Sequence, residues 1–229
     1  MHPFWSFITR FGEAQILLPL TLAFALLLWR RGGATRLALG WLGSIAVVTA
    51  ITTVSKLAFI GWGVGSVQFD FTGVSGHAMF AAAVYPVMFR LLPPGDGQRG
   101  ALWRALGLCA GAMLAALVGI SRLMVDAHSV SEVLAGLALG LTASSLTLRF
   151  ARPAVDRAAA TPGWVPALVA AWLMVLPHSA PASRTHDLVT KLALSLSGRQ
   201  VPYQRSDLLR RLDAPAGRRP SPGGRFDAA

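Results

Sequence analysis

The sequence predicts an all-α polytopic membrane protein, a helix bundle with about six transmembrane helices. Hydrophobic residues make up 54% of its 229 residues and charged residues only 14%, whereas a soluble domain carries about 25% charged residues. The hydrophobic residues also occur in long blocks and not in the short alternating patterns of a soluble core. A soluble helical bundle would need amphipathic faces, so the composition disfavours it.

Six apolar blocks follow one another along the chain: 14–29, 37–55, 78–92, 101–120, 130–148 and 164–177. A transmembrane helix needs about 20 predominantly apolar residues, so the second, fourth and fifth blocks qualify alone and the other three need their flanks. Two pairs of glycines are spaced four apart, Gly107 with Gly111 and Gly136 with Gly140. This spacing favours close approach of helices in lipid.

Arginine is distributed unevenly between the blocks. Three alternate links hold three arginines each: Arg30, Arg31 and Arg36; Arg90, Arg99 and Arg104; Arg149, Arg152 and Arg157. The opposite links hold only Lys56 and Arg122. Because basic loops stay in the cytoplasm, we expect the links 56–77 and 121–128 to face outward. The expected location is the inner membrane, with any site in these links on the periplasmic side.

The chain divides into a membrane domain, residues 1–178, and a tail. Residues 179–213 form an expected extramembrane segment, with a short helix over 185–198 that places Leu188, Leu192 and Leu196 along one side. Such a helix is expected to lie on the membrane surface. Residues 214–229 are rich in Pro, Gly and Arg, which is typical of disorder.

The net charge and the cysteine content limit which binding partners, disulfides and metal sites can be expected. The net charge of +11 comes largely from the basic links and the tail, where anionic lipid headgroups are nearer than nucleic acid. The single cysteine, Cys109, lies in an apolar block, which excludes a disulfide framework. We find no carboxylate cluster suited to Mg²⁺ and no compact His/Cys set suited to Zn²⁺. No metal or other cofactor is therefore expected.

Polar residues that the apolar blocks do not explain fall in three clusters, all on the expected outer side. They are Lys56; Ser75, Gly76 and His77; and Ser121, Arg122, His128 and Glu132. Lys56 and Arg122 supply fixed positive charge, and a Ser-Gly-His turn that leads into a helix supplies N–H groups that favour an anion. Together these clusters indicate a phosphate site.

The histidines add reactive groups to this site. His128 and Glu132 are four residues apart, so on a helix they share a face and the carboxylate can accept a hydrogen bond from one imidazole nitrogen. The other nitrogen stays free as a nucleophile or base, and His77 is placed to protonate a leaving oxygen. Taken singly, each residue also has a plain structural explanation: Lys56 snorkelling to the headgroups, His77 capping a helix, and Glu132 favouring a helix N-terminus. Asp70 and Asp126 are expected to be surface or capping residues.

The three clusters together resemble the type 2 phosphatidic acid phosphatase family, which shares a superfamily with vanadium haloperoxidases and has the pattern K-x6-R-P, P-S-G-H and S-R-x5-H-x3-D. The third motif stands here as Ser121-Arg122, five residues, His128, three residues, Glu132; the second stands as Val74-Ser75-Gly76-His77. Valine replaces the proline of the second motif, and glutamate replaces the aspartate of the third. In the first motif, Gly63 and Val64 stand where the family has arginine and proline, so one phosphate-binding cation is missing.

The resemblance implies a metal-independent phosphatase that acts on a lipid phosphomonoester or diphosphate, of the undecaprenyl diphosphate, phosphatidylglycerol phosphate or phosphatidate type. It implies that His128 attacks phosphorus to form a phosphohistidine, that Glu132 orients His128 and that His77 protonates the leaving group. The implied phosphate-binding residues are Lys56, Ser75, Gly76, Arg122 and, less directly, Ser121. A non-catalytic lipid-phosphate binding or transport protein and a structural scaffold remain as alternatives. The two histidines favour the enzyme, because binding alone needs only cations.

Overall fold

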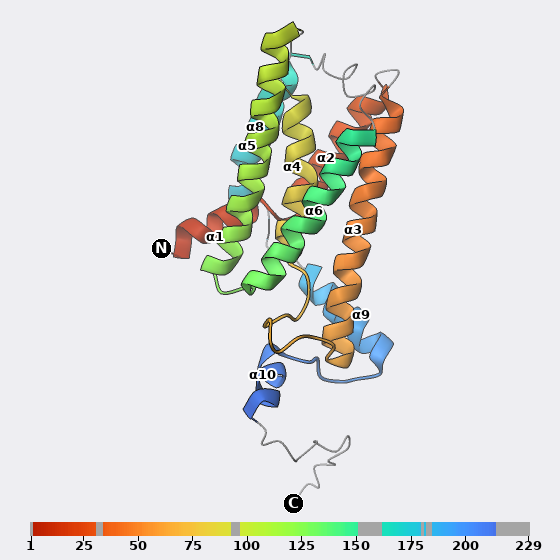
Figure 1. Cartoon of the computed structure of the whole chain (residues 1–229), viewed down its shortest axis with the longest axis vertical. Coiled ribbons are helices and arrows are strands. Elements are labelled where there is room, and N and C mark those ends of the chain that lie inside the picture. Colours follow the sequence, from red (N-terminus) through yellow and green to blue (C-terminus); the bar gives the residue numbers. More distant parts are fainter. Residues whose placement is uncertain are drawn as a thin grey trace, which may run out of the picture.

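The computed structural model describes residues 2–30, 34–92, 97–150, 162–179, 181 and 185–213. Every regular element within these residues is a helix, as predicted. The bundle consists of α2 (Ala14–Arg30), α3 (Thr35–Trp62), α4 (Gly76–Leu91), α5 (Gly97–Met124), α6 (Val130–Phe150) and α8 (Trp164–Ser179). Three short helices, α1 (His2–Arg10), α9 (Thr185–Ser197) and α10 (Arg205–Asp213), lie at its lower part in Figure 1.

Helix α4 is the centre of the bundle, with α2, α5 and α6 around it (Figure 1), and all of its residues from 78 to 88 are buried. Its neighbours come close because they carry glycine at the contacts. A Cβ added to Gly136 of α6 would lie 2.6 Å from the Ser75 carbonyl oxygen, and one added to Gly111 of α5 would lie 2.5 Å from the Tyr85 carbonyl oxygen. A Cβ on Gly140 would overlap the carbonyl of Met79. At these three positions, the predicted close approach of glycine-bearing helices is confirmed.

A proline within α4 is compensated by polar side chains from neighbouring helices. Pro86 has no N–H, so the carbonyl of Ala82 loses its donor within the helix. The hydroxyl of Ser144 donates to that carbonyl oxygen at 2.6 Å, and Nε1 of Trp41 donates to the carbonyl oxygen of Ala83 at 2.9 Å. These bonds tie α6 and α3 to α4, which is how an interrupted helix is tolerated in an apolar environment.

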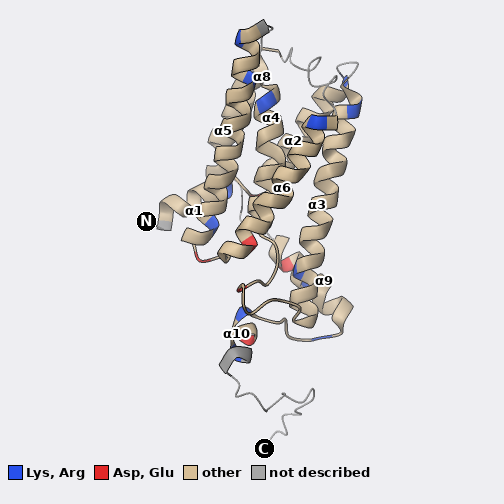
Figure 2. Ribbon diagram, in the orientation of Figure 1, with Lys and Arg blue, Asp and Glu red and all other residues tan. Residues whose placement is uncertain are grey.

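The basic links gather at one end of the bundle. Here α3 begins, α4 ends, α5 begins and α6 ends, and Figure 2 shows most of the Lys and Arg positions of the bundle helices at this end. At the opposite end, α3 ends, α4 begins, α5 ends and α6 begins. The predicted polar clusters all lie at this second end, as the alternation of the links required.

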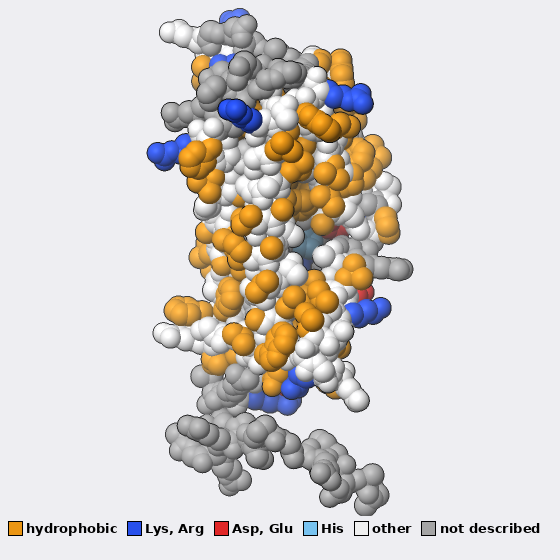
Figure 3. All heavy atoms as spheres, turned by 90° about the vertical axis from the view of Figure 1, so that its right-hand side faces the viewer, with side chains coloured by type: hydrophobic (Ala, Val, Ile, Leu, Met, Phe, Trp, Pro, Cys, Tyr) orange, Lys and Arg blue, Asp and Glu red, His pale blue; other side chains and the backbone are white. Residues whose placement is uncertain are grey.

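The flanks of the bundle are covered by hydrophobic side chains. Figure 3 shows them over the α3 side of the molecule, and residues such as Leu39, Met113 and Leu134 are exposed. Four helical segments are long and apolar enough to cross a membrane: Pro3–Arg30, Thr35–Trp62, Gln98–Met124 and Val130–Phe150. Trp164–Ser179 is apolar but shorter. A membrane helix bundle is therefore confirmed, while six spans and their orientation stay predictions.

Two helices extend beyond the apolar blocks. Helix α3 continues to Trp62 and ends because Gly63 adopts a left-handed φ of 67°, with its N–H bonded to the Phe59 carbonyl oxygen at 2.7 Å. Helix α5 likewise continues to Met124. The prediction that Lys56, Ser121 and Arg122 lie on links was therefore wrong, since both helices continue past the end of their hydrophobic runs.

The tail contains more structure than the sequence indicated. Helix α9 confirms the predicted helix, and Gly198, with φ 69°, follows its end. The leucine side (Leu188, Leu192 and Leu196) is exposed, whereas Ala193 on the other side is buried in a cluster with residues of α3. Helix α10 was not predicted. The segment 214–229, predicted to be disordered, lies outside the described residues.

Candidate active site

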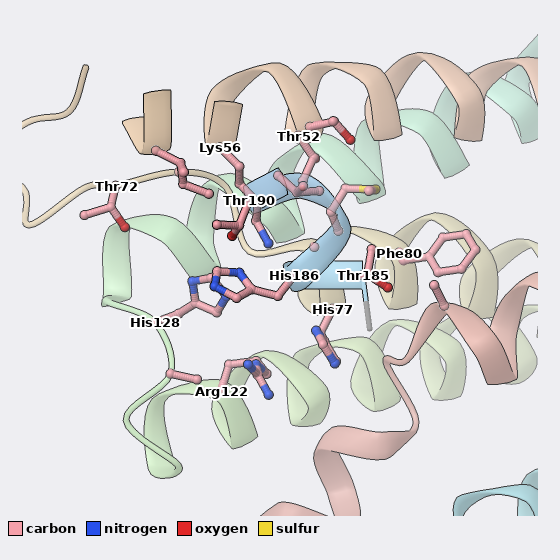
Figure 4. A pocket seen from close by; sticks show the side chains of 18 of the residues that line it. Thr52, Lys56, Thr72, His77, Phe80, Arg122, His128, Thr185, His186 and Thr190 are labelled. Carbon is pink, nitrogen blue, oxygen red and sulfur yellow. The ribbon is translucent and has the colours of Figure 1, made fainter. Parts of the chain in front are cut away.

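A cavity of about 890 Å³ lies at the polar end of the bundle. Among the predicted site residues, those that line it come from four places: Lys56 on α3, Gly76 and His77 on α4, Arg122 on α5 and His128 just before α6. Figure 4 shows the side chains of Lys56, His77, Arg122 and His128 pointing into this common space. Ser75, Ser121 and Glu132 do not line the cavity and are fully buried behind it.

His128 and Glu132 form a direct pair. Nδ1 of His128 lies 2.7 Å from Oε2 of Glu132, whose side chain is 0% exposed. Because the carboxylate accepts this bond, Nδ1 carries the proton and Nε2 keeps a free lone pair. Burial lowers the pKa of His128, and the hydrogen bond to Glu132 only partly opposes that effect. The imidazole is consequently neutral near pH 7 and able to act as a nucleophile.

Glutamate at position 132 has a structural reason. The N–H of Ser129 donates to Oε2 of Glu132 at 3.2 Å, and the N–H of Glu132 faces the Ser129 hydroxyl at 3.5 Å. This reciprocal arrangement is a capping box at the start of α6, a motif that takes Glu or Gln at its last position. Oε1 of Glu132 accepts two further bonds from Thr72, from its N–H at 2.7 Å and its hydroxyl at 2.6 Å. The longer side chain is thus held at both oxygens.

The stretch FTGVSGHAM, residues 71–79, builds the cation-rich wall. Gly73 has φ 148°, and a Cβ there would lie 3.1 Å from Cγ of Lys56, so glycine lets this loop cross directly over α3. A Cβ on Gly76 would lie 3.7 Å from Nζ of Lys56. The ammonium group therefore lies beside the first turn of α4, where free N–H groups also attract anions. The Ser75 hydroxyl, at the N-cap, is buried without a partner among the described residues.

Helix α1 supports the opposite wall, a contribution that the sequence did not reveal. Nη1 of Arg122 donates to the Thr9 hydroxyl at 2.9 Å, and Oγ of Ser121 lies 3.1 Å from the same oxygen. Ser121 thus contacts the group that holds Arg122. Gly12, directly after α1, packs against α4, since a Cβ there would lie 2.9 Å from Cβ of His77. The sequence of this segment, HPFWSFITRFG, is rich in aromatic residues, which suits a membrane interface but does not indicate a contact with α5.

One cation reaches the cavity from the tail, and sequence reasoning missed it. Arg205, the first residue of α10, lines the cavity. Its Nη2 donates to Oε2 of Glu132 at 2.8 Å, and its Nη1 lies 2.6 Å from Oδ2 of Asp70. Asp70, expected to be a surface or capping residue, has a left-handed φ of 46° and binds this arginine. Arg205 and Glu132 are 73 positions apart, so no local pattern connects them.

The cavity is strongly cationic. Lys56, Arg122 and Arg205 line it together with one carboxylate, Glu13, which accepts a bond from Gln15 at 2.7 Å. Such a set of cations is suited to a tetrahedral anion. Among the described residues, no three His, Cys, Asp or Glu side chains come together as a metal site would require.

The family model of the PAP2 superfamily matches residues 49–156, a range that holds every predicted site residue. A protein of Klebsiella pneumoniae, described as an uncharacterized 22.5 kDa protein in the cps region, is 36% identical over 206 residues, covering 89% of this chain and 97% of that protein. This chain belongs to the PAP2 superfamily. Because PAP2 proteins are typically lipid phosphatases, membership indicates a membrane phosphatase.

The name of a second relative states an activity. Phosphatidylglycerophosphatase B of Bacillus subtilis is 41% identical over 72 residues, which cover 31% of this chain and 35% of that protein. No solved structure matched the chain significantly. The match to the PAP2 model ends before the tail, so Arg205 lies outside the region on which family membership rests.

Proposed function

We propose that the protein is an integral membrane lipid phosphatase, which hydrolyses a lipid phosphomonoester or diphosphate through a phosphohistidine intermediate. The observation that carries the proposal is the His128–Glu132 pair beside a cavity lined by Lys56, Arg122 and His77. A protein that only binds lipid phosphate needs the cations alone. An imidazole with Nδ1 held by a buried carboxylate and Nε2 free is the arrangement of an activated nucleophile.

In the first step, Nε2 of His128 attacks phosphorus and a P–N bond forms. The bond from phosphorus to the leaving oxygen breaks and the electron pair departs with that oxygen. The protonated form of His77, which the bound phosphate anion favours, transfers its proton to that oxygen. The Nδ1 proton stays on the ring, where Glu132 balances the positive charge of the phosphorylated imidazole. Lys56, Arg122 and the Gly76 N–H hold the non-bridging oxygens.

In the second step, water attacks the phosphorus of the phosphohistidine. The P–N bond breaks and its electron pair returns to Nε2 of His128. His77, neutral after the first step, accepts the proton of the attacking water and is ready to donate again. Inorganic phosphate leaves, and no group outside the chain is consumed apart from water.

An apolar groove supports a lipid substrate. The residues Leu18, Ile45, Thr49 and Thr53 line both the cavity and a shallow groove along α2 and α3. Figure 3 shows the α3 side of the molecule, where hydrophobic side chains surround a recess with a histidine at its floor. A hydrocarbon chain in this groove would lead from the phosphate into the bilayer. Undecaprenyl diphosphate, phosphatidylglycerol phosphate and phosphatidate all fit this description, and the name of the Bacillus relative favours the second.

The site is proposed to face the periplasm, with the basic links in the cytoplasm. A non-catalytic lipid-phosphate binding or transport protein is the second candidate. The observation that favours it is Gly63, which stands where the resemblance has a phosphate-binding arginine and which ends α3 in a left-handed conformation.

Phosphate release from a panel of lipid phosphates and diphosphates tests the proposal, with protein purified in detergent and with EDTA present. We expect release that persists in EDTA and disappears in His128→Ala. Brief incubation with ³²P-labelled lipid should leave an acid-labile, alkali-stable label on the peptide that contains His128. Folded wild-type protein that binds these lipids but releases no phosphate would instead establish the binding protein.

A further inference from the structure

The sequence GWGVG, residues 61–65, is the surface on which the tail docks. A Cβ on Gly61 would lie 3.2 Å from Cβ of Ser197 on α9. A Cβ on Gly65 would lie 2.6 Å from the Phe71 carbonyl oxygen and 3.5 Å from Cδ1 of Leu208 on α10. A larger residue at position 61 would press against the tail, and one at position 65 would overlap the loop that carries Phe71.

Apolar burial and a backbone bond hold the tail in place. Phe59 and Ile60 of α3 form a buried cluster with Ala193 of α9 and Leu208 of α10. Between these helices, the N–H of Tyr203 donates to the Ile60 carbonyl oxygen at 3.0 Å. The segment 185–213 is thus packed onto the end of α3, and it lines the cavity through residues of α9 such as His186 and Thr190 (Figure 4).

This docking delivers Arg205 to the reactive pair. Nη2 of Arg205 and Nδ1 of His128 approach the same atom, Oε2 of Glu132, at 2.8 Å and 2.7 Å. Nη1 of Arg205 meanwhile donates to the Asp70 carbonyl oxygen at 3.0 Å and pairs with its carboxylate. A planar guanidinium can hold both acidic residues at once, whereas an ammonium group cannot match this fork.

We propose that Arg205 is a positioning residue for the His128–Glu132 pair and that the tail segment 185–213 therefore belongs to the active site. The inference rests on the proposed phosphatase function. Arg205 fixes a carboxylate that is one methylene longer than the family's aspartate. Its positive charge also attracts the negative charge on Oε2 of Glu132. This attraction lessens the stabilisation that Glu132 gives to the protonated form of His128, which is not nucleophilic.

The position of the tail is also related to the arginine that is missing from the first motif. With glycine at position 63, the end of α3 carries no arginine side chain there, and α9 and α10 pack at the flanking glycines instead. The tail adds a third cation to the cavity wall, Arg205, whose Nη2 and Nη1 are held by Glu132 and Asp70. In this chain, the folded tail packs beside the position at which the first motif lacks its arginine.

The first test compares Arg205→Gln, Arg205→Lys and the control Arg210→Gln, an exposed arginine on the same helix. We expect Arg205→Gln to lower kcat/KM at pH 7 by about 10- to 100-fold, in line with losses of partners that orient reactive histidines. Its acid limb should also move to higher pH, because removing a nearby cation raises the pKa of His128. Arg205→Lys should fall between, and Arg210→Gln should match the wild type. An unmoved acid limb in Arg205→Gln would overturn the proposal.

A second measurement does not depend on activity. Diethyl pyrocarbonate modifies neutral imidazole. When the folded protein is modified in detergent and then digested, mass spectrometry of the peptide that contains His128 therefore reports the protonation of this histidine as a function of pH. We expect the midpoint to rise in Arg205→Gln and to fall in Asp70→Asn, which removes the anion that balances Arg205. A purely structural anchor would not shift the two variants in opposite directions, so equal or absent shifts would contradict the role.

These readouts separate the two hypotheses. If the wild type released no phosphate, the phosphatase proposal would fail, while opposite midpoint shifts would still establish that Arg205 controls His128. Thermal unfolding in detergent checks that each variant is folded. Should Arg205→Gln fail to fold, Arg205→Lys and Asp70→Asn carry the same test, and unchanged midpoints in both would refute the inference.

Discussion

At the scale of single residues, the site depends on how one buried carboxylate is shared. Glu132 closes the capping box of α6, binds Thr72 of the loop before α4, orients His128 and receives Arg205. Three separate segments, the start of α6, the loop before α4 and the tail, therefore meet at one side chain. Glutamate in place of the family's aspartate therefore need not weaken the site, because the longer side chain reaches hydrogen-bond donors from all of these segments.

The protonation of His128 predicts the acid side of the pH profile. In the proposed mechanism only the neutral imidazole attacks phosphorus, and burial lowers the pKa of His128 from its ordinary value of 6.5. Activity should therefore persist as pH falls through 6.5 and decline only below it. The measurement is kcat/KM against pH, with a second lipid substrate whose phosphate titrates elsewhere to separate the two titrations. An enzyme limb at or above pH 6.5 would contradict this assignment.

At the scale of elements, packing against α4 positions the candidate site, and a groove runs beside it along α2 and α3. The turn that carries Ser75 and His77 is pressed against α6 at Gly136, so the helix contact and the phosphate site are mechanically one unit. The groove along α2 and α3 shares lining residues with the cavity, so two neighbouring helices form both a wall of the cavity and the groove beside it.

Gly136→Ala should destabilise the bundle by roughly 1–3 kcal/mol, the usual cost of overpacking. The added methyl group would lie 2.6 Å from the Ser75 carbonyl oxygen, so the turn must move and activity should fall as well. Gly43→Ala is the matched control, because a Cβ there meets nothing within 4 Å. Thermal unfolding in detergent measures both. Equal melting temperatures for the two variants would show that the α4–α6 contact tolerates a Cβ.

Ala46→Trp should obstruct the groove, which Ala46 lines on α3. We expect KM for a long-chain lipid phosphate to rise about 10-fold, while turnover of a short-chain, water-soluble phosphomonoester changes little, because the phosphate site itself is untouched. Val47→Trp, at an exposed position on the same helix outside the groove, should leave both substrates unaffected. The same loss for short and long chains in Ala46→Trp would argue against a chain-binding groove.

At the scale of the whole molecule, charge and chemistry are separated along the bundle axis. The basic links lie at one end and the cavity at the other, so the positive-inside rule predicts that the proposed reaction takes place on the outer side of the membrane. The docked tail belongs to the cavity end, which requires that it too lies outside.

Cysteine labelling in intact cells checks this orientation. In a Cys109→Ala background, which removes the chain's single cysteine, Ser206→Cys on α10 should react with a membrane-impermeant maleimide. Arg99→Cys, at the start of α5, should react only after the cells are permeabilised. The reverse pattern would place the active site in the cytoplasm.

The membrane helix bundle, the order of its apolar helices and the candidate-site residues between Lys56 and Glu132 could be predicted from the sequence alone. Hydrophobic blocks, the alternation of basic links and motif spacing are properties of neighbouring residues, so a single chain displays them. The pairing of His128 with Glu132 was predictable for the same reason, because one helical turn separates them.

Only the tertiary structure decided how the site is completed. Thr9 and Arg122 are 113 positions apart and Arg205 and Glu132 are 73 apart, and no period or motif links such distant segments. The end of α3 at Gly63 and the docking of α9 and α10 beside it depend on a cap and on space left by glycines. Hydropathy indicates which residues avoid water. The docking that brings Arg205 to the cavity depends instead on which surfaces fit together.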